Sequence, residues 1–308
     1  MQNSFRQGTG ADYSSHEHQY QNEMLISCII PTRNREELTQ RAIRSVLSQE
    51  TEGCQIEIVV VDDASSDDTP RIIREKYPEV KLVENGSGPS GPGVARNIGA
   101  DAASGEILMF LDSDDLWHPC HAMLLLQGTN GADASFCSTL NRRAQNFTHG
   151  SHEIPVEEFL VPDPEICHLM GKISLLNILA RWCCIMPSSF AIRHTAFREI
   201  GGFPAVAMGE DWLFFLKAAS RCEIKFIREA ATIRTLHPDM SCAKNCSSHE
   251  IRRIFQQVQS FVLNHHRLKE DRELLNWLER HEHLINRESG RWNHIQDWFS
   301  ALKRNGML

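Results

Sequence analysis

The sequence lacks the features that would place the protein across a membrane, on nucleic acid or around structural zinc. No apolar run approaches the ~20 residues that a helix needs to cross a bilayer. The net charge is -8, and no basic stripe with interleaved aromatic residues occurs, which excludes a nucleic-acid groove as the main function. The ten cysteines show no paired metal-type spacing.

A secretory leader is also missing, which predicts reduced thiols and a cytoplasmic location, or a peripheral one at a membrane surface. Cys242 and Cys246 are the only close pair with histidines nearby, and a zinc site there is an unfavoured alternative. With 308 residues and 41% hydrophobic content, the chain can bury a core in one large domain, or in a domain with an appendage.

Strand-like and helix-like segments alternate four times before residue 112. The β-branched run 56–61 is typical of a buried strand, and the amphipathic pattern that follows it begins at Thr69-Pro70, a signal for a helix start. Asn34 and Glu37 predict a capping box for the first helix. This alternation predicts an α/β fold with a parallel sheet covered by helices on both faces.

Polar side chains follow three of the predicted strands at their carboxyl ends. They are Thr32 to Asn34, Asp62 with Asp63, and the Asp-Ser-Asp-Asp segment 112–115. In a parallel sheet these ends lie side by side, so the groups should converge on one crevice, where open α/β folds bind ligands. Asp112 and Asp114 could hold a divalent cation against a diphosphate, because hard cations take oxygen ligands. A solvated turn and helix cap is the alternative for these acids.

The segment Gly86 to Gly91 matches G-x-G-x-x-G, follows a strand and has Asp112 beyond it, which is the dinucleotide fingerprint. It predicts a nicotinamide-dependent oxidoreductase as an alternative function. The match lies in the third strand–helix unit instead of the first, and the helix has no clean start until after Pro92. A loop bordering the crevice is therefore the favoured interpretation.

Four motifs of this half occur in a recognisable order. They are Ile-Ile-Pro-Thr-Arg-Asn-Arg at 29–35, Val-Val-Val-Asp-Asp-Ala-Ser-Ser-Asp-Asp-Thr at 59–69, Ala-Arg-Asn-Ile-Gly at 95–99 and Leu-Asp-Ser-Asp-Asp at 111–115. With them the chain resembles the family 2 glycosyltransferases of the GT-A fold, strongly from residue 25 to about 120 and again at 209–211 and His237. The resemblance implies a Rossmann-like, mostly parallel sheet between helices. It also implies inverting, metal-dependent transfer of one sugar from a nucleoside diphosphate-sugar, with a UDP-sugar expected, to an acceptor hydroxyl (EC 2.4).

The resemblance further implies roles for single residues. Asp211, in Gly209-Glu210-Asp211 at a predicted helix start, is the expected general base. Glu210 is the substitute, and simple helix capping is the alternative for both acids. The remaining expected residues are the ligands of a Mn or Mg ion (Asp114, His237) and the donor-binding residues (Thr32, Asp63, Arg96, Asp112), with Asp63 on an N–H of the base.

Four segments are expected: a flexible tail (1–24), a nucleotide-sugar-binding half (25–128), an acceptor-side half with the base (129–246) and a helical extension (247–308). The extension is amphipathic with a mixed-charge polar face, which favours docking on the catalytic domain or pairing with a second copy over membrane binding. The expected acceptor is a glycan, a lipid-linked molecule or a small molecule. The Gln-x-x-Arg-Trp motif of processive relatives is missing, which favours a single addition. A non-catalytic sugar-nucleotide-binding protein is a second alternative.

Overall fold

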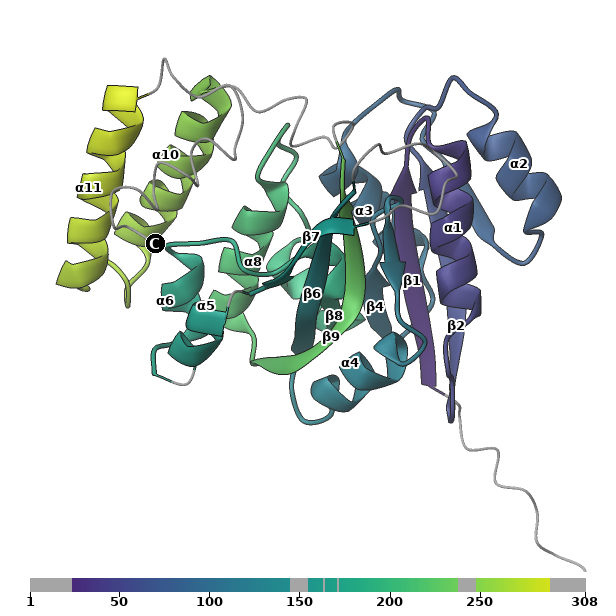
Figure 1. Cartoon of the computed structure of the whole chain (residues 1–308), viewed down its shortest axis with the longest axis horizontal. Helices are drawn as coiled ribbons and strands as arrows, with labels where there is room; N and C mark the ends of the chain where they lie inside the picture. The colour runs from purple at the N-terminus through teal and green to yellow at the C-terminus, as the bar shows by residue number, and fades with distance from the viewer. Residues whose placement is uncertain (1–23, 145–154, 163, 171, 238–247, 289–308) are drawn as a thin grey trace, which may run out of the picture.

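The computed structural model describes residues 24–144, 155–162, 164–170, 172–237 and 248–288 (Figure 1). The predicted tail before residue 24 and the Cys242–Cys246 pair lie outside them. In chain order the elements are β1 (Met24–Thr32), α1 (Glu36–Leu47), β2 (Cys54–Asp62), α2 (Thr69–Lys76), β3 (Lys81–Glu84), α3 (Pro92–Ala102), β4 (Ile107–Phe110), β5 (Asp115–Trp117), α4 (His121–Thr129), β6 (Ala134–Ala144), β7 (Pro155–Val161), α5 (Pro164–Leu169), α6 (Leu175–Leu179), the 3-10 turn η1 (Pro187–Ser189), β8 (Phe190–Arg193), α7 (His194–Ile200), α8 (Glu210–Arg221), β9 (Ile224–Leu236), α10 (Ser248–Asn264) and α11 (Arg272–Glu288).

One sheet of nine strands runs through the described residues, in the order β3-β2-β1-β4-β8-β6-β9-β5, with β7 paired to β6. Strand β1 pairs in parallel with β2 and β4, and β2 pairs in parallel with β3. The parallel sheet predicted for the first half is therefore confirmed. Beyond β4 the sheet is mixed, because β8 is antiparallel to both β4 and β6 whereas β9 is parallel to β6.

The first strands are buried on both faces, so neighbouring residues of one strand enter different cores. Ile29 and Phe110 join the core that α3, α7 and α8 cover. Ile30 and Met109 point the other way, into the core under α1, α2 and α4. Packing on both faces holds the carboxyl ends of these strands in place, which gives the side chains beyond them a rigid support.

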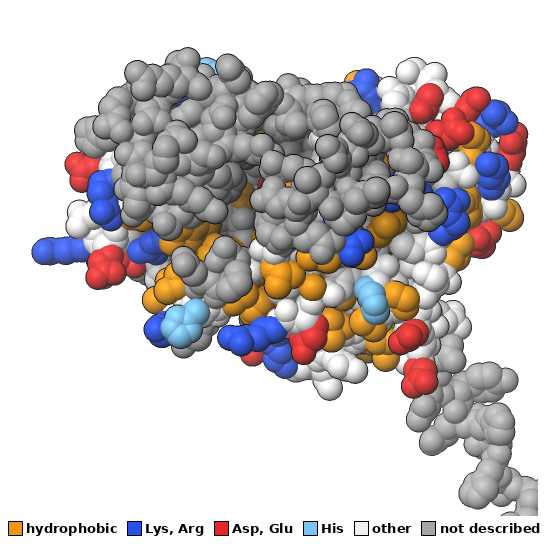
Figure 2. All heavy atoms as spheres, in the orientation of Figure 1, with side chains coloured by type: hydrophobic (Ala, Val, Ile, Leu, Met, Phe, Trp, Pro, Cys, Tyr) orange, Lys and Arg blue, Asp and Glu red, His pale blue; other side chains and the backbone are white. Residues whose placement is uncertain are grey.

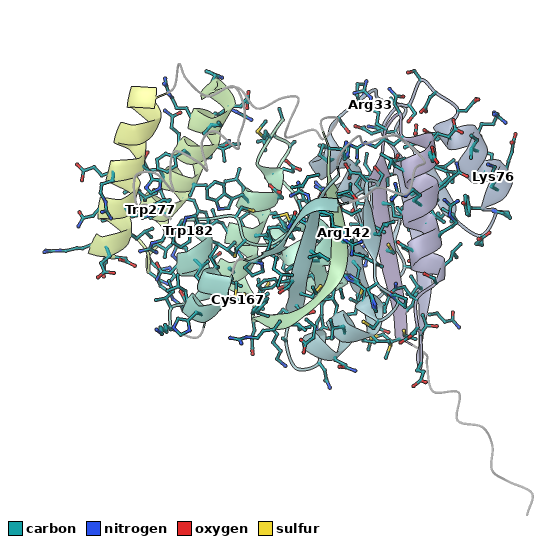
Figure 3. The ribbon with its side chains drawn as sticks, in the orientation of Figure 1. Arg33, Lys76, Arg142, Cys167, Trp182 and Trp277 are labelled. Atoms are coloured by element: carbon teal, nitrogen blue, oxygen red, sulfur yellow. The ribbon has the colours of Figure 1, made fainter. Side chains whose placement is uncertain are left out.

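The C-terminal helices α10 and α11 dock on the rest of the chain. Val258 of α10 and Leu274 of α11 are fully buried in the core that also contains α8. Figure 3 shows Trp182, which follows α6, beside Trp277 of α11, and their ring centroids are 5.9 Å apart. The expected docking of the helical extension on the preceding domain is thus confirmed for residues 248–288. Pairing with a second copy stays a prediction, and the apolar faces of these helices are already buried within the chain.

The described surface carries mixed charge. In Figure 2 acidic and basic side chains are interspersed at both ends of the visible face. On α2, for example, Arg71 pairs with Asp68 at 3.0 Å and with Glu75 at 2.9 Å. None of the helices in the described ranges combines the length and apolar character needed to cross a bilayer.

The start of α1 corrects the predicted capping box. Arg35 is the N-cap residue and makes no side-chain cap, while Asn34 adopts a left-handed conformation with φ of 51°. The Asn34 Oδ1 atom accepts a hydrogen bond from the Ser66 backbone N–H at 2.7 Å, and the Asn34 N–H donates to Ser65 Oγ at 2.8 Å. The cap prediction was wrong because this side chain ties the loop after β1 to the loop after β2.

Candidate active site

A cavity of about 320 Å³ lies where the ends of β1 and β4 meet the start of α8. This volume is within the range of small-molecule sites. Its polar lining residues come from both halves of the sheet, and its apolar ones come mainly from segments after residue 180. The lining consists of Pro31, Arg35, Pro92, Arg96, Asp112, Ser113, Asp114, Trp182, Cys183, Met186, Ala207, Met208, Gly209, Glu210, Asp211, Trp212, Arg234, Ile251, Ile254 and Phe255.

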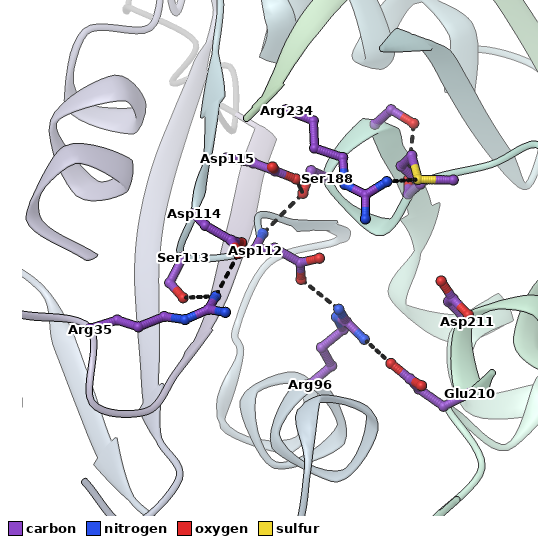
Figure 4. Close-up of polar contacts among 12 residues, drawn as sticks. Arg35, Arg96, Asp112, Ser113, Asp114, Asp115, Ser188, Glu210, Asp211 and Arg234 are labelled. Carbon is purple, nitrogen blue, oxygen red and sulfur yellow. Dashed lines mark hydrogen bonds and ion pairs between the residues drawn. The ribbon is translucent and has the colours of Figure 1, made fainter. Parts of the chain in front are cut away.

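Arg96 joins the two sides of this cavity (Figure 4). Its side chain rises from α3, and the residue is 2% exposed. The Nη2 atom lies 2.5 Å from Asp112 Oδ1, beyond β4, and the Nη1 atom lies 3.1 Å from Glu210 Oε1 at the start of α8. A buried cation between two carboxylates fixes their separation, so Arg96 sets the spacing between the β4 end and the first turn of α8.

Asp114 is held by two basic side chains. Its Oδ2 atom lies 2.9 Å from Arg35 Nη1 and 3.1 Å from His237 Nε2. Arg35 also donates to Ser113 Oγ at 3.1 Å. Burial by itself would raise the pKa of Asp114, but the His237 hydrogen bond and the Arg35 charge hold that pKa well below its ordinary value. Asp114 is therefore ionised at neutral pH.

Asp115 is set apart from the other two acids of the cluster. It is 3% exposed, and its Oδ2 atom accepts a hydrogen bond from Ser188 Oγ at 2.5 Å. Ser188 Oγ in turn accepts the Asp112 backbone N–H at 3.0 Å. Burial and the charges of Asp114 and Asp112 raise the pKa of Asp115 well above its ordinary value. Through Ser188 this side chain fixes the backbone of the cluster.

The two acids at the start of α8 differ in their partners. The Glu210 carboxylate is bound to Arg96, and burial together with the charge of Asp211 raises its pKa to about 7. The Asp211 carboxylate accepts the Trp212 backbone N–H at 2.7 Å, and the side chain forms no ion pair with the described residues. Burial also raises the pKa of Asp211, against the opposing charge of Arg96. A raised pKa makes a carboxylate a stronger base.

Two of the predicted donor-binding residues are not brought to the cavity. Thr32 is 3% exposed, and its hydroxyl lies 2.6 Å from the hydroxyl of Thr39 on α1. Asp63 accepts hydrogen bonds from the backbone N–H of Ser90 and of Gly91. These bonds lower the pKa of Asp63 although burial opposes them. Both side chains therefore have partners within the chain, and their roles toward a donor stay predictions.

The same contacts argue against a dinucleotide-binding site at the loop Gly86 to Gly91. In a dinucleotide site the backbone N–H groups of the glycine-rich loop bind the pyrophosphate. Here the N–H groups of Ser90 and Gly91 are used by Asp63, 2.8 to 3.0 Å away. The loop also follows β3, at the edge of the sheet. These contacts leave the nicotinamide hypothesis without support.

The Asp114–His237 pair fits a divalent cation by its chemistry. An ionised carboxylate oxygen and an imidazole nitrogen converge at 3.1 Å, close enough to share one ion. Among the described residues, no group of three or more His, Cys, Asp or Glu side chains is arranged to hold a metal, so water and phosphate oxygens would supply the other ligands. Arg35 would have to move, because it occupies the same oxygen at 2.9 Å.

Three residues of the site were not predicted from the sequence. Arg35 lies inside the first motif, so its neighbours carried a signal. The sequence carries no such signal for Ser188 or Arg234, because each comes from a segment whose pattern is that of an ordinary turn or strand. Arg234 reaches the cavity from β9, and its Nη1 atom lies 3.5 Å from the Met186 sulfur.

Known proteins resemble this chain in sequence and in fold. A GalNAc(5)-diNAcBac-PP-undecaprenol beta-1,3-glucosyltransferase of Campylobacter jejuni is 40% identical over 93 residues, which is 29% of each chain. The structure of S. aureus TarS 1–349 with UDP-GlcNAc matches with a TM-score of 0.59 at 22% identity, over 79% of this chain and 68% of that one. The mannosyltransferase PcManGT of Pyrobaculum calidifontis, with GDP-Man and Mn²⁺, matches with a TM-score of 0.51 at 20% identity, over 75% of this chain and 61% of that one.

The structural matches confirm the expected GT-A fold. The chain spans only 29% of the length of the C. jejuni relative that it matches. The family model described as Glycosyl transferase family 2 matches residues 27–201, which is more than half of the chain. Together with the order of motifs around the cavity, this match shows that the chain belongs to glycosyl transferase family 2.

Proposed function

We propose that the protein is an inverting glycosyltransferase that moves one sugar from a nucleoside diphosphate-sugar to an acceptor hydroxyl. The observation that carries the proposal is the arrangement of one cavity. Asp114, with Arg35 and His237, stands at one side, and Asp211 stands at the start of α8, 12 residues long, on the other. Family membership and the solved relatives with UDP-GlcNAc and GDP-Man support the donor class. A UDP-sugar is the first choice.

In this proposal Asp211 is the general base. It accepts the proton of the acceptor hydroxyl while the acceptor oxygen forms a bond to the anomeric carbon. The bond from that carbon to the diphosphate breaks at the same time, and the nucleoside diphosphate leaves with the electron pair. Such a base typically contributes ~10²- to 10⁴-fold. Attack from the face opposite the leaving group inverts the anomeric configuration.

Arg96 and Asp112 have a supporting part. The buried Arg96 holds Glu210 and Asp112 in fixed positions, so it keeps Asp211 at a set distance from the donor side. This is positioning, which removes the entropic cost of bringing groups together at each turnover. Asp112, with one oxygen on Arg96, is proposed to contact the donor ribose or the metal through its second oxygen.

A divalent ion, Mn or Mg, would be held by Asp114 and His237. When bound, such an ion supplies positive charge that stabilises the departing diphosphate. Arg35, once displaced from Asp114 by the ion, can add to this effect, because its guanidinium lines the same cavity. The Mn²⁺ in the P. calidifontis relative supports a metal here.

The test is a panel of nucleotide sugars, with cell extract as the acceptor source, read by mass spectrometry and by NMR of the product. Wild-type chain should give a product of inverted configuration. Asp211→Asn should keep its affinity for the nucleotide and lose transfer by about 10²-fold or more. A product with retained configuration, or near wild-type transfer by Asp211→Asn, would remove Asp211 from the mechanism.

The alternative is a non-catalytic protein that binds sugar nucleotides. The same experiment distinguishes it from an enzyme. Such a protein binds the nucleotide and turns over none of the donors. The place of Asp211 in the lining of the cavity, without an ion pair to the described residues, supports the enzyme, because such a carboxylate can accept a proton from a bound molecule.

A further inference from the structure

The cavity has two unlike walls. Most of its charged residues stand at the ends of β1 and β4 and at the start of α8, Arg96 comes from α3, and Arg234 enters from β9 beside Met186. The rest of the lining is mainly apolar and includes Trp182, Met208 and three residues of α10. A ligand that spans the cavity therefore meets ion pairs at one end and hydrocarbon at the other.

Helix α10 contributes Ile251, Ile254 and Phe255 to this wall. Their spacing of three and four places them on one helix face. All three belong to the core that includes α8, with exposed fractions of 3%, 6% and 2%. The family match ends at residue 201, so α10 is a part of this chain that the family pattern does not describe.

The apolar wall reaches the proposed base through Gly209. This glycine has a φ of +80°, and a Cβ atom added to it would lie 2.8 Å from Ile254 Cγ1. Helix α10 thus packs directly against the backbone that begins α8. Glu210 and Asp211 directly follow Gly209 in the sequence. The side chain of Ile254 therefore packs against the backbone two residues before the proposed base.

Trp182 and the two methionines complete the wall on the other side. Trp182 stands edge to face with Trp277 of α11 at 5.9 Å. Its Nε1 atom is buried and has no hydrogen-bond partner among the described residues. Because this atom has no accessible surface, Trp182 offers ring carbon, not its N–H, to a molecule in the cavity. The wall is therefore suited to an apolar group.

We infer that the acceptor presents an uncharged, ring-sized apolar group to the wall formed by Trp182, Met208, Ile254 and Phe255, next to the hydroxyl that is glycosylated. The inference rests on the proposed function and deepens it. An anionic or strongly hydrated group at this position would lose water without gaining partners. An apolar ring would bury its surface against aliphatic and aromatic side chains. Acceptor selection thus belongs to α10 and to the segments 182–186 and 207–208.

The experiment compares phenyl and methyl β-glycosides of glucose, galactose and N-acetylglucosamine. Their binding to the full chain, saturated with UDP, is measured by calorimetry. At least one phenyl glycoside should bind about tenfold more tightly than its methyl counterpart, because only the phenyl ring reaches the apolar wall. Met208→Gln keeps the length of the side chain, Ile254→Thr removes one methyl group, and both make the wall polar, so each should bring this ratio close to one.

The matched control is Val262→Thr, because Val262 is buried on the same helix but does not line the cavity. It should lower the melting temperature and keep the phenyl preference. Equal binding of phenyl and methyl glycosides by the wild-type chain, or a preference that survives Met208→Gln with Ile254→Thr, would overturn the inference while leaving donor binding intact. Absence of UDP and GDP binding by the wild-type chain would instead remove the proposed function, and this inference with it.

Discussion

In the proposed function one side of the cavity binds the donor and the other binds the acceptor, and these two sides are held together by different forces. On the donor side, Asp112, Asp114 and Arg96 are fixed by ion pairs of 2.5 to 3.1 Å that leave little freedom. On the acceptor side, Ile254 and Phe255 are fixed by apolar packing, which tolerates a change of shape better than a change of polarity. The difference predicts that a lost charge acts mainly on the donor side and a change of polarity mainly on the acceptor side.

Replacing Asp114 on the donor side should have the largest effect. Asp114→Asn keeps the shape, removes the charge that Arg35 and His237 share, and should lower transfer by about 10³-fold. Mn²⁺ binding, followed by electron paramagnetic resonance, should weaken in parallel. Asp68→Asn is the control, because Asp68 is exposed and pairs only with Arg71. Full activity of Asp114→Asn in chelator-treated buffer would show that this side does not depend on a metal.

Removing the bridge between the two sides should follow in size. Arg96→Met leaves the buried Glu210 and the partly exposed Asp112 without their shared cation, which should cost about 3 kcal/mol in the free energy of unfolding. Denaturant unfolding measures this loss. Arg71→Met, which breaks only exposed pairs, should cost less than about 1 kcal/mol. Similar losses for the two variants would mean that Arg96 does not couple the sides.

Changing the contact between the apolar wall and the base should have a moderate effect. In Gly209→Ala the new Cβ atom would clash with the Ile254 side chain, and the positive φ would strain the backbone. The variant should destabilise the fold by about 2 kcal/mol and reduce transfer. Gly201→Ala is the matched control, because Gly201 has a φ of +87° with open space around it. Gly201→Ala should cost stability through backbone strain alone. If the two variants transferred sugar equally well, the contact with α10 would not position Asp211.

The smallest effect concerns the pH dependence of stability. The pKa of Glu210 rises from 4.5 to about 7 on folding, so its contribution is full below pH 4.5 and is lost as the pH rises toward 7. Glu210→Gln should therefore flatten the fall in unfolding free energy between pH 5 and pH 7, by on the order of 1–2 kcal/mol. Glu75→Gln, at an exposed site, should leave the slope unchanged. An identical slope for wild type and Glu210→Gln would show that Glu210 is not the titrating group.

Most of the donor side could be predicted from the sequence, because its residues follow strands at motif positions. Asp112 and Asp114 were placed in the crevice by the alternation of strands and helices, Arg96 was expected from the family resemblance, and the structure brings the three together. Thr32 and Asp63 have the same position at strand ends, yet their side chains turn to Thr39 and to the Ser90 loop. A pattern of strands fixes where a residue lies in the sheet and leaves open which neighbour takes its hydrogen bonds.

The acceptor side was much less legible. The amphipathic pattern predicted that α10 would be a helix with an apolar face, and this is confirmed. The sequence did not predict that the apolar face of α10 would line the cavity beside Gly209. This contact joins segments about forty residues apart, and no local sequence pattern indicates such packing. Ser188 and Arg234 were missed for the same reason.

The position of α10 has a practical meaning for truncation. A chain cut at residue 201, where the family match ends, would lack α8 with Asp211, β9 with Arg234, and α10. It would also expose Phe110 and Phe197, which pack against Phe203. Such a fragment would lose the proposed base and the core packing that α8 and α10 supply in a single step. The C-terminal helices are therefore better regarded as part of the catalytic unit than as an accessory that can be exchanged.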